Sequence, residues 1–151
     1  MPNTPSSGLP HPLSYDTSVE GIVTDNVTGL IWQKEPASFS VTQKDAANVC
    51  KALNLGGHTD WRLPSRLELV SLLAIERESG VDSTAFPASP LDTEAFPGPE
   101  EVTSGWTWSS SLFPSMGDEP VWALATRFGD GFTWDERLPG GWLSRCARQD
   151  P

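Results

Sequence analysis

Short apolar runs alternate with turn-forming clusters along the chain. Ile22-Val23-Thr24 and Leu30-Ile31-Trp32-Gln33 are two such runs, rich in β-branched and aromatic residues. Between them lies the turn-forming cluster Asp25-Asn26-Val27-Thr28-Gly29. Two β-prone runs around a turn cluster are typical of a β-hairpin. We therefore predict a hairpin over residues 22–33.

A helical spacing follows over residues 42–54. Thr42 and Asp45 match the N-cap and the third helical position of a capping box. Apolar residues recur there with the spacing of one buried helix face. That face is expected to hold Ala46, Val49, Cys50 and Leu53. Gly56-Gly57 is expected to end the helix.

A second helix is predicted to begin at Ser65, because Ser65 and Glu68 form an S-x-x-E capping box directly after Pro64. We expect this helix to end near residues 76–78. Its apolar residues predict one buried face. They are Leu67, Val70 and Ala74, with Leu69, Leu72 and Leu73 widening the face.

The last third of the chain has the composition of strands. We predict strands over residues 106–111, 121–128, 132–134 and 142–148. Residues 121–128 are apolar on both faces, which indicates a central strand. A hairpin, two helices and then an antiparallel meander predict an α+β fold, in which two helices pack on a twisted antiparallel sheet with long irregular loops.

The chain has 151 residues, which suits a single core. Residues 1–20 are rich in Pro, Ser and Thr, so we expect an extended, partly disordered lead-in before one domain over residues 21–151. Residues 76–104 carry seven acidic residues, one basic residue and four prolines. We expect this segment to be a long irregular loop, pinned by Phe86 and Phe96, and a candidate functional surface.

The chain is strongly acidic, with 20 Asp and Glu against 10 Lys and Arg, for a net charge of −10. Nucleic acids and anionic membranes attract clustered Lys and Arg, so neither partner is expected. No apolar run approaches about 18 residues, which argues against membrane insertion. Seven Trp, 14 Pro and 13 Gly suit a loop-rich domain held by aromatic packing.

Four short motifs carry a family resemblance. They are Asp25-x-x-Thr28-Gly29-Leu30-Ile31-Trp32-Gln33, Asp60-Trp61-Arg62-Leu63-Pro64-Ser65 followed by Glu68-Leu69, Trp108-Ser109-Ser110-Ser111, and Ser144-Arg145-Cys146-Ala147-Arg148. In this order, over about residues 20–148, they resemble the Lcl C-terminal domain family, named for the C-terminal domain of a bacterial collagen-like adhesin. The resemblance implies a C-type-lectin-like fold, related to that of formylglycine-generating enzymes, in an exported bacterial protein that is periplasmic or at the cell surface.

The two cysteines, Cys50 and Cys146, lie 96 positions apart, and neither has a second Cys or a His at the short spacing of a metal site. Two buried thiols or a disulfide remain. In the fold that the resemblance implies, a helix cysteine pairs with a cysteine on the last core strand, so we favour a disulfide and an oxidising compartment. The first eight residues lack the basic end and apolar core of a signal peptide.

The signature residues Asp60, Trp61, Arg62 and Glu68 invite a catalytic hypothesis, but a motif at a helix start is expected to be structural. We expect Trp61 to fill the core and Arg62 to pair with a carboxylate or with carbonyl groups. Asp60 is expected to hold the turn before the helix.

Aromatic and charged residues of the C-terminal half form the candidate ligand site. They are Phe113, Trp134, Asp135, Arg137 and Trp142. Aromatic faces beside polar groups suit sugar rings or a protein partner. The alternative is that Trp134 and Trp142 belong to the core. That is the place we expect for Trp32, Trp61, Trp108 and Trp122.

No cofactor is expected. Sugar-binding C-type lectins hold calcium with Glu-Pro-Asn and Trp-Asn-Asp motifs, whereas Glu119-Pro120 is followed here by Val121. Carboxylates are calcium ligands in general. Asp118 and Glu119, with Asp135 and Glu136, are therefore weak calcium candidates, and solvated loop charges are the alternative.

We expect a non-enzymatic recognition module that binds a glycan or a protein through loops of the C-terminal half. The motifs of nucleophilic, P-loop and zinc hydrolases are absent. The alternatives are an oxidase related to formylglycine-generating enzymes, which needs free thiols, and a hydrolase with paired carboxylates. A structural module of a larger surface protein and a diversified ligand-binding protein also remain.

Overall fold

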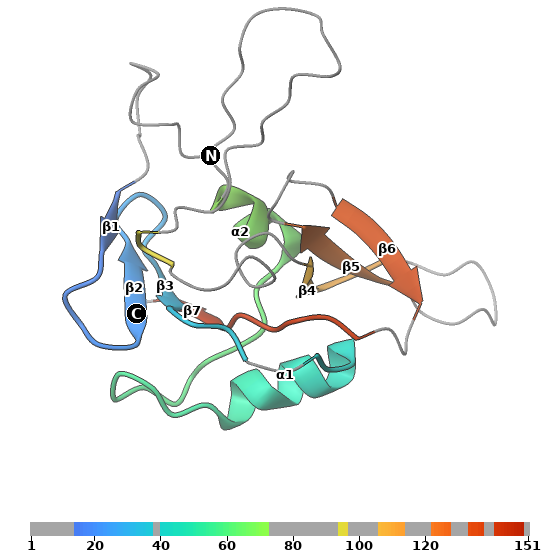
Figure 1. The fold of residues 1–151 in the computed structure, drawn as a ribbon, viewed down its shortest axis with the longest axis horizontal. Coiled ribbons are helices and arrows are strands. Elements are labelled where there is room, and N and C mark those ends of the chain that lie inside the picture. The colour runs from blue at the N-terminus through green and yellow to red at the C-terminus, as the bar shows by residue number, and fades with distance from the viewer. Residues whose placement is uncertain are drawn as a thin grey trace, which may run out of the picture.

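The computed structural model describes residues 14–37, 40–72, 94–96, 106–113, 122–127, 133–137 and 141–149. Its elements, in chain order, are β1 (Tyr15–Asp16), β2 (Ile22–Asp25), β3 (Leu30–Gln33), α1 (Gln43–Ala52), α2 (Arg66–Ser71), β4 (Trp106–Phe113), β5 (Trp122–Arg127), β6 (Thr133–Arg137) and β7 (Ala147–Gln149) (Figure 1). The strands form two antiparallel sheets, in the orders β1-β2-β3-β7 and β4-β5-β6. The predicted α+β class is confirmed.

The predicted hairpin is confirmed as β2 and β3, which pair with Ile22 opposite Gln33. Asp25 is fully buried and organises the turn between them. Its carboxylate accepts hydrogen bonds from the amide of Val27 at 2.8 Å and from the hydroxyl of Thr28 at 2.7 Å. Gly29 has a φ of 73°, a conformation that glycine adopts without strain. The first motif therefore builds a turn.

The first sheet extends beyond the hairpin at both sides. Tyr15–Asp16, expected in the lead-in, forms β1 and pairs with β2. The strand predicted over residues 142–148 is shorter than expected and lies elsewhere: β7 covers only Ala147–Gln149 and pairs with β3. It is therefore not part of a C-terminal meander. Local pattern does not encode a pairing partner more than 100 residues away, which explains the error.

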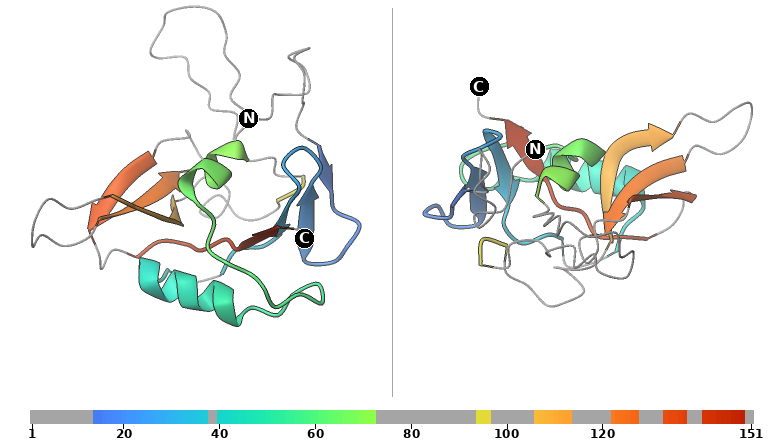
Figure 2. Two further views of the ribbon diagram at one scale, coloured as in Figure 1. Left: turned by 180° about the vertical axis from the view of Figure 1, so that it is seen from behind. Right: turned by 90° about the horizontal axis from the view of Figure 1, so that it is seen from above.

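The second sheet is the expected C-terminal meander of β4, β5 and β6. The prediction that the segment around Trp122–Arg127 is central is confirmed, since β5 lies between β4 and β6. The pairing of β4 with β5 shifts register between Trp108 and Leu112. Figure 2 shows this sheet at the opposite end of the domain from the first sheet.

Helix α1 begins as predicted, with Thr42 as N-cap accepting a hydrogen bond from the amide of Asp45. It ends at Ala52, before the predicted stop at Gly56-Gly57. Both glycines have positive φ and belong instead to the turn after the helix. Of the expected face, Ala46 and Cys50 are buried, and Val49 and Leu53 are half-buried.

Helix α2 has the predicted capping box of Ser65 and Glu68 and ends at Ser71, earlier than the pattern predicts. The predicted buried face was wrong in part. Leu69 and Leu72 are fully buried, whereas Leu67 is 67% exposed. The helix is only six residues long, so it buries a narrow face rather than a wide one.

The first sheet is covered on both faces. One core cluster packs Val23, Leu30 and Trp32 against α2 and Phe96. The other packs Ile22 and Ile31 against α1, the signature Trp61 and the second sheet. The expected anchoring by Phe96 agrees with its full burial, and Phe86 lies outside the described residues. Trp32, Trp61 and Trp108 are buried as expected, and the side chain of Trp122 lies outside the described residues.

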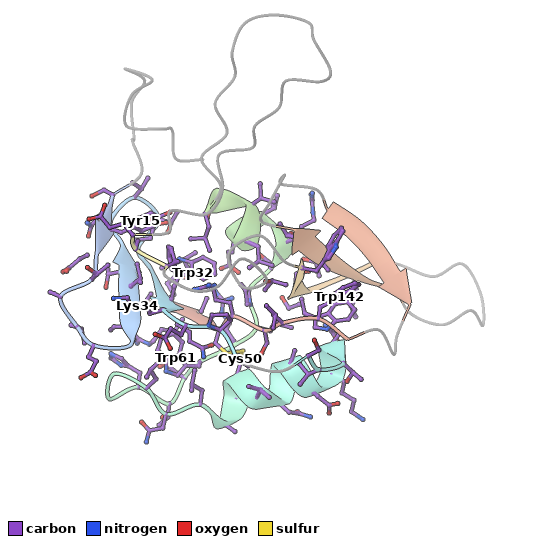
Figure 3. The ribbon with its side chains drawn as sticks, in the orientation of Figure 1. Tyr15, Trp32, Lys34, Cys50, Trp61 and Trp142 are labelled. Carbon is purple, nitrogen blue, oxygen red and sulfur yellow. A yellow bond between two sulfur atoms is a disulfide. The ribbon has the colours of Figure 1, made fainter. Side chains whose placement is uncertain are left out.

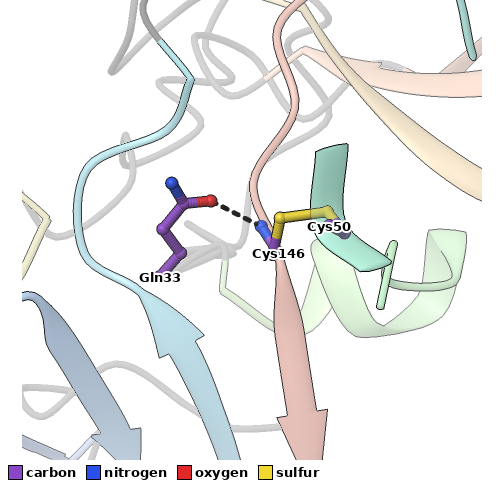
Figure 4. The surroundings of a disulfide bond; sticks show 3 residues. All are labelled: Gln33, Cys50 and Cys146. Atoms are coloured by element: carbon purple, nitrogen blue, oxygen red, sulfur yellow. Dashed lines mark hydrogen bonds between the residues drawn. A yellow bond between two sulfur atoms is a disulfide. The ribbon is translucent and has the colours of Figure 1, made fainter. Parts of the chain in front are cut away.

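The disulfide between Cys50 and Cys146 is confirmed, and both residues are fully buried (Figure 4). It joins the last turns of α1 to the residue that precedes β7, with a Cα–Cα distance of 5.4 Å. It closes a loop that contains α2 and the three strands of the second sheet. The bridge thus restrains the chain over the greater part of its length.

Replacing both cysteines with alanine should lower the free energy of unfolding by about 4–5 kcal/mol, because a bridge across 96 positions removes much of the entropy of the unfolded chain. Urea unfolding of the oxidised protein and of the double variant, followed by tryptophan fluorescence, measures this difference. A decrease below about 1 kcal/mol would be close to the effect of an ordinary surface substitution. It would contradict the stabilising role assigned to the bridge.

Candidate functional site

The signature tryptophan is part of the core. Trp61 is 2% exposed, and its indole N–H donates to the carbonyl oxygens of Leu55 at 3.3 Å and His58 at 3.1 Å. These two bonds fix the turn after α1, in which Leu55 and His58 also exchange main-chain hydrogen bonds. Trp61 therefore supports the frame and is not available to a ligand.

Arg62 and Glu68 form a two-pronged ion pair, with nitrogen–oxygen distances of 2.9 and 2.6 Å. Glu68 also accepts from the amide of Ser65 at 2.7 Å, which completes the capping box. Partial burial acts to raise the pKa of Glu68, but the hydrogen bonds from Arg62 and Ser65 outweigh it and lower this pKa. The hydrogen bonds to Glu68 in turn raise the pKa of Arg62. The pair therefore remains charged at neutral pH.

Asp60 pairs with Arg148, at 2.8 Å between the carboxylate and Nε. The side chain of Arg148 is 5% exposed, whereas that of Asp60 is 58% exposed. The hydrogen bond from Arg148 lowers the pKa of Asp60. Asp60 thus holds the C-terminal strand. From the sequence we had expected it to hold the turn before α2.

Arg145, which lies in the last of the four sequence motifs, is a fully buried cation, and no local pattern predicts its burial. Its Nη1 donates to the carbonyl oxygens of Gln33 and Lys34, and its guanidinium carbon lies 4.9 Å from the ring centre of Phe96. Nε and Nη2 have no hydrogen-bond partner among the described residues. Burial lowers the pKa of Arg145 to about 9, so it is still charged at neutral pH. It fixes the backbone at the end of β3.

Of the predicted ligand site, the structure describes the side chain of Trp142. It is half-buried and lies against Trp106, with ring centres 5.8 Å apart and planes tilted by 39°. We call these two residues the tryptophan pair. The indole nitrogen of Trp142 is buried without a hydrogen-bond partner in the described part of the chain, while its backbone exchanges hydrogen bonds with Val41. Figure 3 shows Trp142 beside the second sheet.

The other predicted site residues are placed only by their backbones. Trp134, Asp135 and Arg137 lie on β6, paired with Ala125, Leu124 and Trp122, respectively. Phe113 ends β4. Asp118 and Glu119 lie outside the described residues. Within the part of the chain that the structure describes, no group of three metal-ligating side chains occurs.

A groove of about 450 Å³, which we did not predict from the sequence, lies at the other end of the domain from the tryptophan pair (Figure 3). Its lining consists of Glu20, Gly21, Gln33, Lys34, Glu35, Leu53 and Leu55. We call it the β2–β3 groove. The available signal was the charged pair Lys34-Glu35 directly after the apolar strand β3. The contribution of Leu53 and Leu55 to the groove could not be predicted from the sequence, because it depends on how the turn after α1 packs on the hairpin.

The order of these elements and motifs matches a known family. The model of the Lcl C-terminal domain matches residues 21–147. The chain belongs to the Lcl C-terminal domain family. A comparison with curated proteins found no match. Among the described residues of this Lcl domain, no helix is both long and apolar enough to cross a membrane.

Glu68 should make the stability of this Lcl domain depend on pH. Its pKa is lower in the folded state, so its contribution is present above the unfolded-state value of about 4.3 and is lost as the pH falls through the folded-state value. We expect Glu68→Ala to lower the free energy of unfolding at pH 7 by about 1–3 kcal/mol, through loss of the cap and of a half-exposed, solvent-screened ion pair.

Glu68→Gln should flatten the decline of stability below about pH 4.5. Urea unfolding between pH 3 and 7 provides the measurement, and the exposed Glu35→Gln is the matched control. An unchanged pH profile in Glu68→Gln would contradict the assignment.

Proposed function

We propose that this Lcl domain is a non-enzymatic recognition module of an exported bacterial protein and that it binds a glycan through the surface around the tryptophan pair. This proposal rests on the half-buried contact of Trp106 with Trp142. Every other tryptophan with a described side chain is buried in the core. Aromatic faces beside polar groups are well suited to the apolar faces of sugar rings.

The signature motifs support recognition rather than catalysis, because their polar groups serve the frame. Glu68 caps α2 and pairs with Arg62, and Asp60 holds Arg148. Asp25 organises the hairpin turn. Perturbed carboxylates can mark active sites, but a structural ion pair perturbs them equally well.

The disulfide argues against the alternative of a thiol-dependent oxidase. Both cysteines of the chain are engaged in the bridge, so neither supplies a thiolate. The bridge also favours an oxidising compartment, in agreement with export to the periplasm or cell surface. A C-type-lectin-like fold, proposed from the family, accommodates a helix-to-strand bridge of this kind.

The charge of the domain favours a neutral glycan. A net charge of −10 repels sulfated polymers. Binding by ring stacking needs neither a basic patch nor a cofactor, and we propose no calcium requirement. Phe113, Trp134, Asp135 and Arg137 are proposed as further contributors, because β4 and β6 belong to the same sheet as Trp106.

The proposal predicts that the domain is retained on an array of neutral glycans more strongly than on sulfated ones. Trp142→Ala should weaken binding at least about tenfold, because an aromatic stack contributes about 0.5–1.5 kcal/mol beyond the area that it buries. Trp142→Phe keeps a ring and should retain part of the affinity. The matched control is Leu67→Ala, at an exposed apolar residue of α2.

Thermal unfolding of each variant separates loss of the ring from loss of the fold. Absence of retention on the array, or equal binding by folded Trp142→Ala and the unsubstituted domain, would refute the proposal. Retention on sulfated glycans that rises as salt is lowered would also refute it, since charge and not stacking would then govern binding.

A further inference from the structure

The β2–β3 groove is formed by three segments that meet beside the disulfide. Gly21 precedes β2, Gln33 ends β3 with Lys34 directly after it, and Leu53 and Leu55 follow α1. It has no residue in common with the tryptophan pair. Figure 3 shows Lys34 and Trp142 at opposite sides of the domain. A ligand in the groove would therefore be independent of the proposed glycan.

The rim of the groove is held rigidly from behind. The amide of Lys34 donates to the carbonyl of Gly21 at 2.9 Å, which ties the two sides together. The amide of Gln33 donates to Cys146, whose own amide donates to Oε1 of Gln33 at 3.1 Å (Figure 4). Arg145 then holds both carbonyls of the rim. Such a rim is already ordered before binding, which lowers the entropic cost of taking up a ligand.

The fixed side-chain amide of Gln33 presents a donor. Because Oε1 accepts from Cys146, the amide is oriented, and Nε2 has no hydrogen-bond partner among the described residues. Gln33 is half-buried and is one of the residues that line the groove. A ligand oxygen is the complementary partner.

Three charged residues line the groove together with Gln33. Glu20, Lys34 and Glu35 line the groove, and in the described part of the chain none of the three forms an ion pair. The hairpin register places Gly21 beside Lys34, so Glu20 and Glu35 flank the same end of the ladder. Exposed carboxylates are complementary to a ligand ammonium, and Lys34 offers a partner for a ligand carboxylate.

The apolar part of the lining completes the description of a ligand. Leu53 and Leu55 are half-buried and pack against the second core cluster. They offer an aliphatic wall to the groove. A volume of about 450 Å³ is within the range of small-molecule sites.

We propose that the β2–β3 groove binds a small zwitterion with an aliphatic part, of the chemical class of an apolar α-amino acid or the corresponding end of a peptide. The ammonium lies between Glu20 and Glu35, the carboxylate meets Lys34 and Nε2 of Gln33, and the aliphatic part packs on Leu53 and Leu55.

Titration of the ¹⁵N-labelled oxidised chain with L-leucine, followed by amide chemical shifts, tests this assignment. We expect saturable shifts at residues 20–21, 33–35 and 53–55 below about 10 mM ligand, since a small ligand with a Kd of about 1 mM gains only about 4 kcal/mol. N-acetyl-leucine lacks the ammonium and leucinamide lacks the carboxylate, and each should bind at least about tenfold more weakly. Titration with leucyl dipeptides then shows whether the groove prefers the end of a peptide or a free amino acid.

Lys34→Gln should weaken leucine binding and leave leucinamide binding unchanged, whereas Glu20→Gln/Glu35→Gln should weaken both. The matched control is Lys44→Gln, at an exposed lysine of α1 outside the groove. The dispersed amide spectrum shows that each variant is folded. Absence of saturable shifts, shifts centred elsewhere, or equal binding of leucine and its two blocked forms would overturn the proposal and leave the three charges as solvated surface groups.

Discussion

The segment from Trp142 to Ala147 holds the two sheets and α1 in one frame. Trp142 exchanges main-chain hydrogen bonds with Val41, and Leu143 bonds to the backbone of β4. Cys146 is bridged to α1 and bonded to Gln33 of β3. Ala147 exchanges two bonds with Arg62 of the signature motif. Because β7 begins only at Ala147, the segment acts as an extended tie between the sheets rather than as a strand of one of them.

This tie also determines where ligands can be recognised. At its start, Trp142 is pressed against Trp106 and remains half-buried at the surface. At its end, Arg145 and Cys146 fix Gln33 and Lys34 in the rim of the β2–β3 groove. The buried cation of Arg145 is costly to desolvate, and carbonyl oxygens with the ring of Phe96 offset part of that cost. Most polar residues of the family motifs thus stabilise the frame of the domain.

The elements with strong local signals were predictable from the sequence. The hairpin follows from Asp25, Thr28 and Gly29, and both helix starts follow from their caps at Thr42 and Ser65. The burial of Leu69 rather than Leu67, and the pairing of β7 with β3, depend on distant partners that no local spacing reveals. The disulfide was predictable only through the family resemblance, and the groove was not predictable because its three segments meet only after folding.

Native-state hydrogen exchange on the oxidised protein tests the central role of this segment most directly. The amides of Trp142, Leu143, Cys146 and Ala147 all donate within the protein. If the segment ties the two sheets together, these amides exchange only through global unfolding, with opening free energies equal to the stability measured by denaturant. Exchange of these amides through a smaller local opening, while the β2–β3 hairpin stays protected, would show instead that the segment is an appendage.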